Sequence, residues 1–115
     1  MLARKYRLTA EKDYARIFAK GRPFSGRGIG MKVVRNGLET SRFGFVVSTK
    51  VAKRAVVRNL IKRRMREIVR KRMPSVTDGI DVVFMARSEA VKMTFADIER
   101  TVGELLAKAG IIKKV

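Results

Sequence analysis

Positive side chains at a fixed spacing are the residues of this sequence best placed to do chemistry. On a helix that turns by about 100° per residue, cations at every fourth position form one ladder along a single face. Their mutual repulsion costs the helix about 0.2–0.5 kcal/mol per pair, so an external anion is expected to balance it. Phosphate groups are suited to that role, because each cation can displace a counterion of a polyanion. The five members of the ladder are Arg54, Arg58, Lys62, Arg66 and Arg70.

The whole chain shares this excess of positive charge. Its 115 residues contain 28 Lys+Arg against 10 Asp+Glu, a formal net charge of +18. A compact domain with so much like charge repels itself, which favours a polyanionic partner. A nucleic acid is expected rather than a membrane surface, because the apolar side of the basic helix is needed for packing. A ribosomal or general RNA-packaging protein and a DNA-binding regulator are the alternatives, although no second short helix precedes the ladder as a helix-turn-helix requires.

Residues for protein-borne catalysis are missing from the sequence. It has no histidine and no cysteine, which removes the commonest general base and the commonest zinc ligands. Metal-dependent cleavage needs converging carboxylates, but the acidic residues are scattered over a turn, a strand start and one exposed helix. The sequence also lacks a long apolar run and a signal-peptide core. We therefore expect a cytoplasmic, membrane-free binding protein that has no catalytic residue, holds no metal or cofactor itself and forms one domain over residues 1–115.

Local patterns predict the elements that would carry the ladder. The segment 10–20 is predicted to be a helix capped by Thr9 and closed by Gly21. Alternation predicts two strands, which the strong turn signal Asn36-Gly37 would join as a hairpin. A long helix, a strand covered on both faces and a final helix follow; Thr94 and Gly110 would bound the last helix. The strands are expected at 29–35, 42–48 and 80–87, with a further short strand near Phe24, and the long helix at 51–72.

These elements give an α+β fold of order α-β-β-α-β-α, to which the short strand near Phe24 would add one strand, and a small central sheet is packed by helices. Alternation directs Met31, Val33, Phe43, Phe45 and Val47 into the core. On the long helix the apolar side is predicted to comprise Val57, Leu60, Ile61, Met65, Ile68 and Val69. The opposite side holds Asn59 and Arg63 beside the ladder.

Two aromatic residues of the first helix have an open assignment. Tyr14 and Phe18 lie on one face, where they serve either as core or as a platform on which unpaired bases stack. Arg4, Lys5 and Arg7 precede that helix and are expected to form a mobile arm that touches phosphates.

The stretch "RFGFVVSTKVAKRAVVRNLIKRRMRE" resembles the signature region of the bacterial ribonuclease P protein subunit. In that family a strand R-x-G-x-x-x-S precedes a Lys-rich turn and the helix R-N-R-x-K-R-x-x-R. "RLTAEKDYARIFAKG" is similar to the first family helix and "DVVFMAR" to the last strand, so nearly the whole chain is covered. Leu60 departs from the pattern where the family has its second arginine, and Arg64 and Lys32 stand where an apolar and an aromatic residue are common. The matching residues are Arg42, Gly44, Ser48, Lys50, Arg54, Ala55, Arg58, Asn59, Lys62, Arg63 and Arg66.

The resemblance implies a specific function. Such proteins bind the catalytic RNA of ribonuclease P, which removes the 5′ leader of precursor tRNA with RNA-bound Mg²⁺. The resemblance also implies a left-handed β-α-β crossover and a cleft for the leader between the first helix and the sheet. We expect a monomeric protein in a 1:1 complex with the RNA. The implied contacts to catalytic RNA are Lys50, Lys53, Arg54, Arg58, Asn59, Lys62, Arg63 and Arg66, and the implied leader cleft is Tyr14, Phe18, Lys32 and Ser48.

Overall fold

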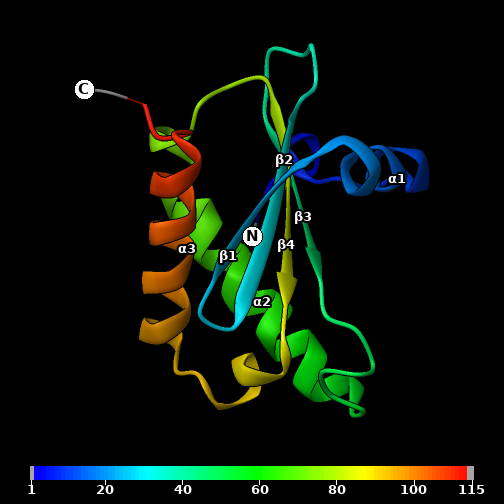
Figure 1. Cartoon of the computed structure of the whole chain (residues 1–115), viewed down its shortest axis with the longest axis vertical. Helices are drawn as coiled ribbons and strands as arrows, with labels where there is room; N and C mark the ends of the chain where they lie inside the picture. The colour runs from blue at the N-terminus through cyan, green and yellow to red at the C-terminus, as the bar shows by residue number, and fades with distance from the viewer. Residues whose placement is uncertain (1, 114–115) are drawn as a thin grey trace.

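A four-stranded sheet with helices on both faces forms the molecule (Figure 1). The computed structural model describes residues 2–113, so Met1, Lys114 and Val115 of the predicted domain lie outside the described residues. The predicted α+β class is confirmed, and so is the short strand near Phe24. The elements in chain order are η1 (Arg4–Tyr6), α1 (Glu11–Lys20), β1 (Arg22–Gly26), β2 (Ile29–Arg35), β3 (Arg42–Val46), α2 (Ala55–Arg72), η2 (Met73–Ser75), β4 (Ile80–Ala86), η3 (Ser88–Lys92) and α3 (Phe95–Ala109).

The strand order β1-β2-β4-β3 places the last strand of the chain in the interior of the sheet. β2 pairs antiparallel with β1 and with β4, and β3 pairs parallel with β4. α2 is therefore the crossover that a parallel pair requires. The left-handed sense implied for this connection stays a prediction.

The predicted hairpin between β2 and β3 is wrong, because β4 lies between them. Asn36 instead closes a loop onto the start of β4. Its side-chain oxygen accepts a hydrogen bond from the Leu38 N–H at 2.7 Å, and its amide donates to the Asp81 carboxylate at 2.9 Å. Gly37 takes a positive φ of 71°, which glycine adopts without strain. The turn is real, but the strand that pairs with β2 comes later in the chain.

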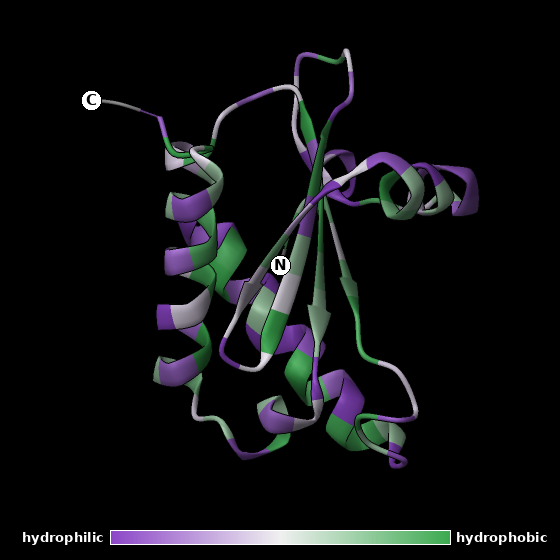
Figure 2. Ribbon diagram, viewed as in Figure 1, coloured by the Kyte–Doolittle hydropathy of each residue, from purple (hydrophilic) through white to green (hydrophobic). Residues whose placement is uncertain are grey.

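One face of the sheet carries the main core. α2 and α3 pack on this face, and their apolar sides turn toward the strands while polar residues face outward (Figure 2). Met31, Phe43 and Val47 are buried as predicted, and Val33 and Phe45 pack against the same cluster. Leu60 is the exception on α2, since it is only partly buried and belongs to neither core cluster.

The opposite face of the sheet is only partly covered. α1 crosses it, and Ile17 forms a small buried cluster there with Leu8 and Val83. Tyr14 packs against that cluster, as do Val34, Val46 and Met85. α1 is the sole α-helix of residues 2–113 on this side (Figure 1), and Lys32, Val46 and Met85 are only partly buried, so part of the face stays open.

The helix ends follow the local signals unevenly. Thr94 caps α3 and exchanges hydrogen bonds with Asp97, and Gly110 ends it with a left-handed φ of 68°, so both predictions are confirmed. Thr9 is wrong as a cap, because α1 is capped at Ala10 without any side-chain bond. α2 begins at Ala55, four residues later than predicted, because the preceding residues form turns.

Candidate nucleic-acid interface

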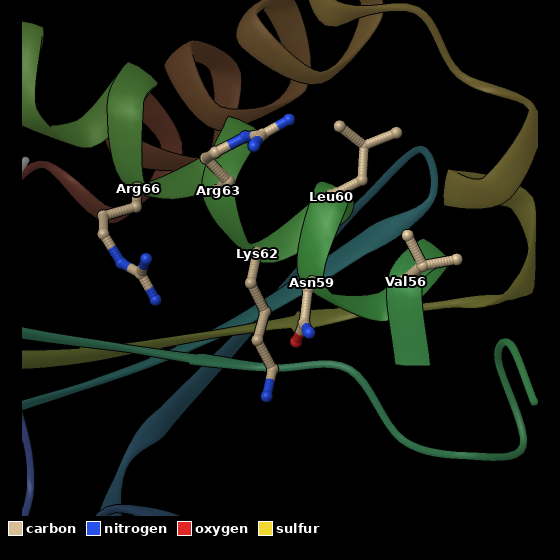
Figure 3. Close-up of a pocket in the computed structure, with 6 residues that line it drawn as sticks. All are labelled: Val56, Asn59, Leu60, Lys62, Arg63 and Arg66. Carbon is tan, nitrogen blue, oxygen red and sulfur yellow. The ribbon is translucent and has the colours of Figure 1, made fainter. Parts of the chain in front are cut away.

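The outer face of α2 carries the predicted ladder. Its inner side chains Ile61, Met65, Ile68 and Val69 are buried against the sheet and α3, so the register of the helix is fixed by packing. The cations consequently lie on the remaining face, and Figure 3 shows Lys62 and Arg66 on one side of the helix and Arg63 on the other. Among the predicted residues of this helix, Asn59 and Arg63 are exposed, whereas Arg58, Lys62 and Arg66 are half-buried.

Two rungs of the ladder are engaged within the protein. Arg58 donates to the carbonyl oxygens of Ala52 at 2.9 Å and Lys53 at 2.7 Å, and thereby holds the loop before α2. Arg70 forms an ion pair with Glu67 at 2.6 Å, which lowers the pKa of that carboxyl group and raises the pKa of the guanidinium. The cations of the ladder are therefore not equivalent: Arg54, Lys62 and Arg66 make no ion pair within residues 2–113.

A small hollow brings cations from separate elements together. Arg7, Lys62 and Arg66 line it with Tyr14 and Gly44, where the N-terminal segment, α1, β3 and α2 meet; its volume is about 120 Å³. Arg7 lines the hollow, and its Nε is buried without a hydrogen-bond partner among the described residues. A buried donor without an acceptor is costly, and guanidinium groups match phosphate oxygens well. The hollow is thus suited to a phosphate group. Arg7 is held here by a bridge to Phe43, so the expectation of a mobile arm is wrong for this residue.

Tyr14 forms one wall of this hollow. Its hydroxyl donates to the Leu8 carbonyl at 3.2 Å, and burial raises its pKa despite an opposing hydrogen bond and the nearby positive charge of Arg66. The ring lies directly over Gly44, where an added Cβ would stand 2.5 Å from the hydroxyl oxygen. Tyr14 therefore packs closely on β3, and Gly44 in the signature provides the space that its ring needs.

A buried carboxylate fixes the start of β3. Asp81 is fully buried and accepts hydrogen bonds from Arg42 at 2.7 and 3.0 Å, and from Arg16 at 2.6 Å. The hydrogen bond to this carboxylate is the main reason that the pKa of Arg42 is raised. Arg42, the first signature residue, thus positions the strand and is engaged within the protein.

The loop before α2 extends the cationic surface. Its backbone turns at Ser48, whose carbonyl accepts hydrogen bonds from the N–H groups of Val51 and Ala52. Lys50, Lys53 and Arg54 are all exposed along this loop. The loop and the outer side of α2 therefore form one continuous cationic surface. We call the outward-facing side chains of residues 50–66 the basic face.

The open sheet face brings together three of the four predicted cleft residues. Tyr14 and Phe18 are one turn apart on α1, and the Lys32 ammonium lies 5.7 Å from the centre of the Phe18 ring and donates to the Phe18 carbonyl at 2.7 Å. Phe18 keeps 40% of its surface exposed. Ser48 is exposed beyond the end of β3, so it extends the same face away from α1.

Arg87 was not predicted as a site residue. It follows β4 directly, and its guanidinium donates to the Ser25 hydroxyl at 2.9 Å and covers Gly30. This places a further cation on the open face, two residues along from Met85. Side chains alternate between the two faces along β4, and this alternation could have placed Arg87 on the same face as Met85.

Metal ligands do not gather anywhere in residues 2–113: no group of three His, Cys, Asp or Glu side chains is close enough to hold an ion. Asp81, the most buried carboxylate, is already saturated by arginine and asparagine donors. In the same part of the chain, no helix has the length and apolar character needed to span a membrane.

The fold and these surfaces define a single-domain α+β protein with a cationic, nucleic-acid-binding character. Comparison with known proteins agrees. The sequence model of the family described as Ribonuclease P matches residues 2–110. A "Ribonuclease P protein component" from Dehalococcoides mccartyi is 44% identical over 94% of this chain and 88% of the relative. One from Syntrophomonas wolfei is 36% identical over 99% of this chain and 95% of the relative.

Solved structures give the same result. The RNase P protein of Staphylococcus aureus superimposes with a TM-score of 0.86 at 29% identity, covering 94% of this chain and 98% of the other. That of Thermotoga maritima gives 0.81 at 28% identity, covering 89% and 96%. The chain belongs to the ribonuclease P protein family. Its members are protein components of a ribonucleoprotein endonuclease of tRNA processing, and membership implies association with ribonuclease P RNA.

Proposed function

We propose that this chain binds the catalytic RNA of ribonuclease P through the basic face and holds the 5′ leader of precursor tRNA on the open sheet face. In this way it assists RNA-catalysed removal of the leader during tRNA 5′ maturation. Family membership supports the partner RNA, and the geometry supports the division into two surfaces. The carrying observation is the small hollow, which is lined by Arg7, Lys62 and Arg66 from separate elements.

Phosphate binding in this hollow accounts for its composition. Three cations in one small space repel one another unless an anion lies between them. A phosphodiester oxygen would accept hydrogen bonds from the Arg7 guanidinium, and its charge would be shared with Lys62 and Arg66. The contacts fix the position of the protein on an RNA backbone without reading its sequence.

The contribution to catalysis is electrostatic. Catalytic RNA and precursor tRNA are both polyanions, and a protein with a net charge of +18 lowers their repulsion when it lies between them. Mg²⁺ held by the RNA would supply the metal chemistry of the cleavage step, as the resemblance to the ribonuclease P protein family implies. The protein's own role is to bind and to orient, as a monomer in a 1:1 complex with the RNA.

The open face suits a single-stranded leader. Phe18 offers an exposed ring for stacking, and Lys32 and Arg87 supply positive charge on the same side of the sheet. A mature tRNA has no leader, so this face would favour the precursor.

The test is cleavage of 5′-labelled precursor tRNA by a bacterial ribonuclease P RNA at low Mg²⁺, with and without the protein. We expect leader release with RNA and protein together, and none with protein alone. If the RNA gains nothing while the protein still binds it tightly, the proposed function is wrong and a general RNA-packaging role replaces it.

A further inference from the structure

An apolar step interrupts the basic face in the first half of α2. Val56 and Leu60 are one helical turn apart and point to the same side of the helix, next to Arg63 (Figure 3). Val56 keeps 63% of its surface exposed, more than any other large apolar side chain in residues 2–113. Leu60 is partly buried but contributes to neither core cluster. Packing of α2 on the sheet therefore does not explain this pair.

The surroundings of the step restrict what can cover it. Val56 and Leu60 border an open hollow of about 680 Å³ whose other lining residues are Asn59, Lys62, Arg63 and Arg66. A ligand of this hollow must combine an apolar surface with negative charge. A nucleotide has both, because its base presents a flat face while its phosphate is anionic.

We infer that Val56 and Leu60 form a seat for the face of one unpaired nucleobase of the partner RNA. Arg63 extends on the same side of the helix as the pair and can contact an adjoining phosphate, whereas the Asn59 amide points to the other side of α2 (Figure 3). The inference rests on the proposed function, because it assigns a part of the same basic face.

The departure from the family signature at Leu60 changes the kind of contact that this position can make with RNA. The signature described above has an arginine at this position, whereas this chain has an apolar side chain that lines one hollow together with Lys62, Arg63 and Arg66. A cationic contact releases counterions and weakens with salt, but an apolar contact with a base does not. One part of the RNA-binding free energy of this chain should therefore be independent of salt.

Affinity for a bacterial ribonuclease P RNA, measured across a range of KCl concentrations, separates the two kinds of contact. Leu60→Ala should weaken binding roughly fivefold to tenfold at every salt concentration, with an unchanged slope of log K against log[salt]. Leu60→Arg should steepen that slope by about 0.7–0.9. Val56→Ala repeats the test at a more exposed position, where the substitution removes little packing. Val91→Ala on η3 is the matched control, because that valine is also exposed but lies off the basic face.

Chemical probing of the RNA bases locates the contact. At saturating protein, one or a few unpaired nucleotides protected by the wild-type chain should regain reactivity with Leu60→Ala, while backbone protections persist. Wild-type RNA affinity of both Leu60→Ala and Val56→Ala would overturn the seat. A changed salt slope for Leu60→Ala, or a base-protection pattern of Leu60→Ala identical to that of the wild type, would overturn it as well. If the wild-type chain activates the RNA in the cleavage assay, a negative result for the variants rejects only the base seat. If the wild-type chain does not activate the RNA, the proposed function itself is rejected.

Discussion

Individual residues of the signature divide into those that hold the fold and those that face outward. Arg42 and Gly44 belong to the first group, because one is bound to Asp81 and the other makes room for Tyr14. Arg58 also bonds inward, to the loop before α2. Lys62 and Arg63 make no ion pair within residues 2–113, so their charge is available to a partner. Substitution of a signature residue should therefore affect stability at the inward-bonded positions and RNA binding at the outward-facing ones.

Asp81→Asn tests the buried cluster. The change leaves Arg16 and Arg42 without their shared carboxylate, and we expect the free energy of unfolding to fall by about 2–3 kcal/mol. The loss should be smaller than for a sealed pair, because both guanidinium groups are partly exposed. Urea denaturation measures it. The control Asp78→Asn, which removes a surface pair with Lys113, should cost less than about 0.5 kcal/mol; equal losses would contradict the structural role of Asp81.

Phe18→Ala tests the open face. The exposed ring contributes little to packing, so the melting temperature should stay near that of the wild type. Affinity for precursor tRNA in the holoenzyme should fall by about 1–2 kcal/mol, as expected for the loss of one stacked base. Binding of mature tRNA should be unchanged. An equal loss for both substrates would show that Phe18 does not contact the leader.

At the scale of elements, α2 performs two tasks with two faces. Its inner side closes the main core against the sheet and α3, and its outer side carries the basic face. The apolar spacing fixes the rotation of the helix, and that rotation determines which cations point outward. Stability and RNA binding should therefore be separable by substitution.

Ile68→Ala and Arg63→Gln form the test of this separation. Ile68 is fully buried, so its truncation should lower the free energy of unfolding by about 2–4 kcal/mol. Arg63 is exposed, and its neutralisation should leave stability nearly unchanged while weakening binding to the catalytic RNA. Thermal melting and RNA titration of both variants provide the comparison. If folded Ile68→Ala protein lost as much RNA affinity as Arg63→Gln, the inner and outer faces of α2 would not act independently.

How far the sequence predicted these elements depends on how local their signals are. β2 was predicted with its observed bounds, and the cap and end of α3 were correct, because Thr94 and Gly110 act within a few residues. The pairing of β2 was wrong, since Asn36-Gly37 is a local turn signal whereas the true partner β4 is distant in sequence. The ladder was visible from spacing alone. The inward bonds of Arg58 and the meeting of Arg7 with α2 depend on tertiary packing and were not predictable.

At the scale of the whole molecule, charge has both a general and a local effect. The net charge of +18 attracts any polyanion over a distance of about 8–10 Å at moderate salt. The basic face adds contacts that depend on position. Two double variants of equal net charge can distinguish these contributions.

The variant Lys62→Gln/Arg63→Gln should reduce the salt slope of RNA binding by about 1.4–1.8. The matched variant Lys92→Gln/Arg100→Gln removes the same charge from exposed positions on η3 and α3, and should leave the slope within error of wild type. Affinity measured across KCl concentrations gives both slopes. Identical slopes for the two variants would assign binding to net charge and remove the special role of the basic face.

The interior position of β4 has a consequence for how the protein is made. During synthesis β2 can pair at once with β1, but β3 is not its neighbour in the sheet and must wait for Ile80–Ala86. Until that strand arrives, the apolar sides of α2 and the earlier strands have no complete core, and the cations of the nascent chain repel one another. Closing the loop between distant strands is also slow compared with hairpin formation. Folding should therefore be close to all-or-none, and a fragment that ends before β4 should not adopt a stable structure.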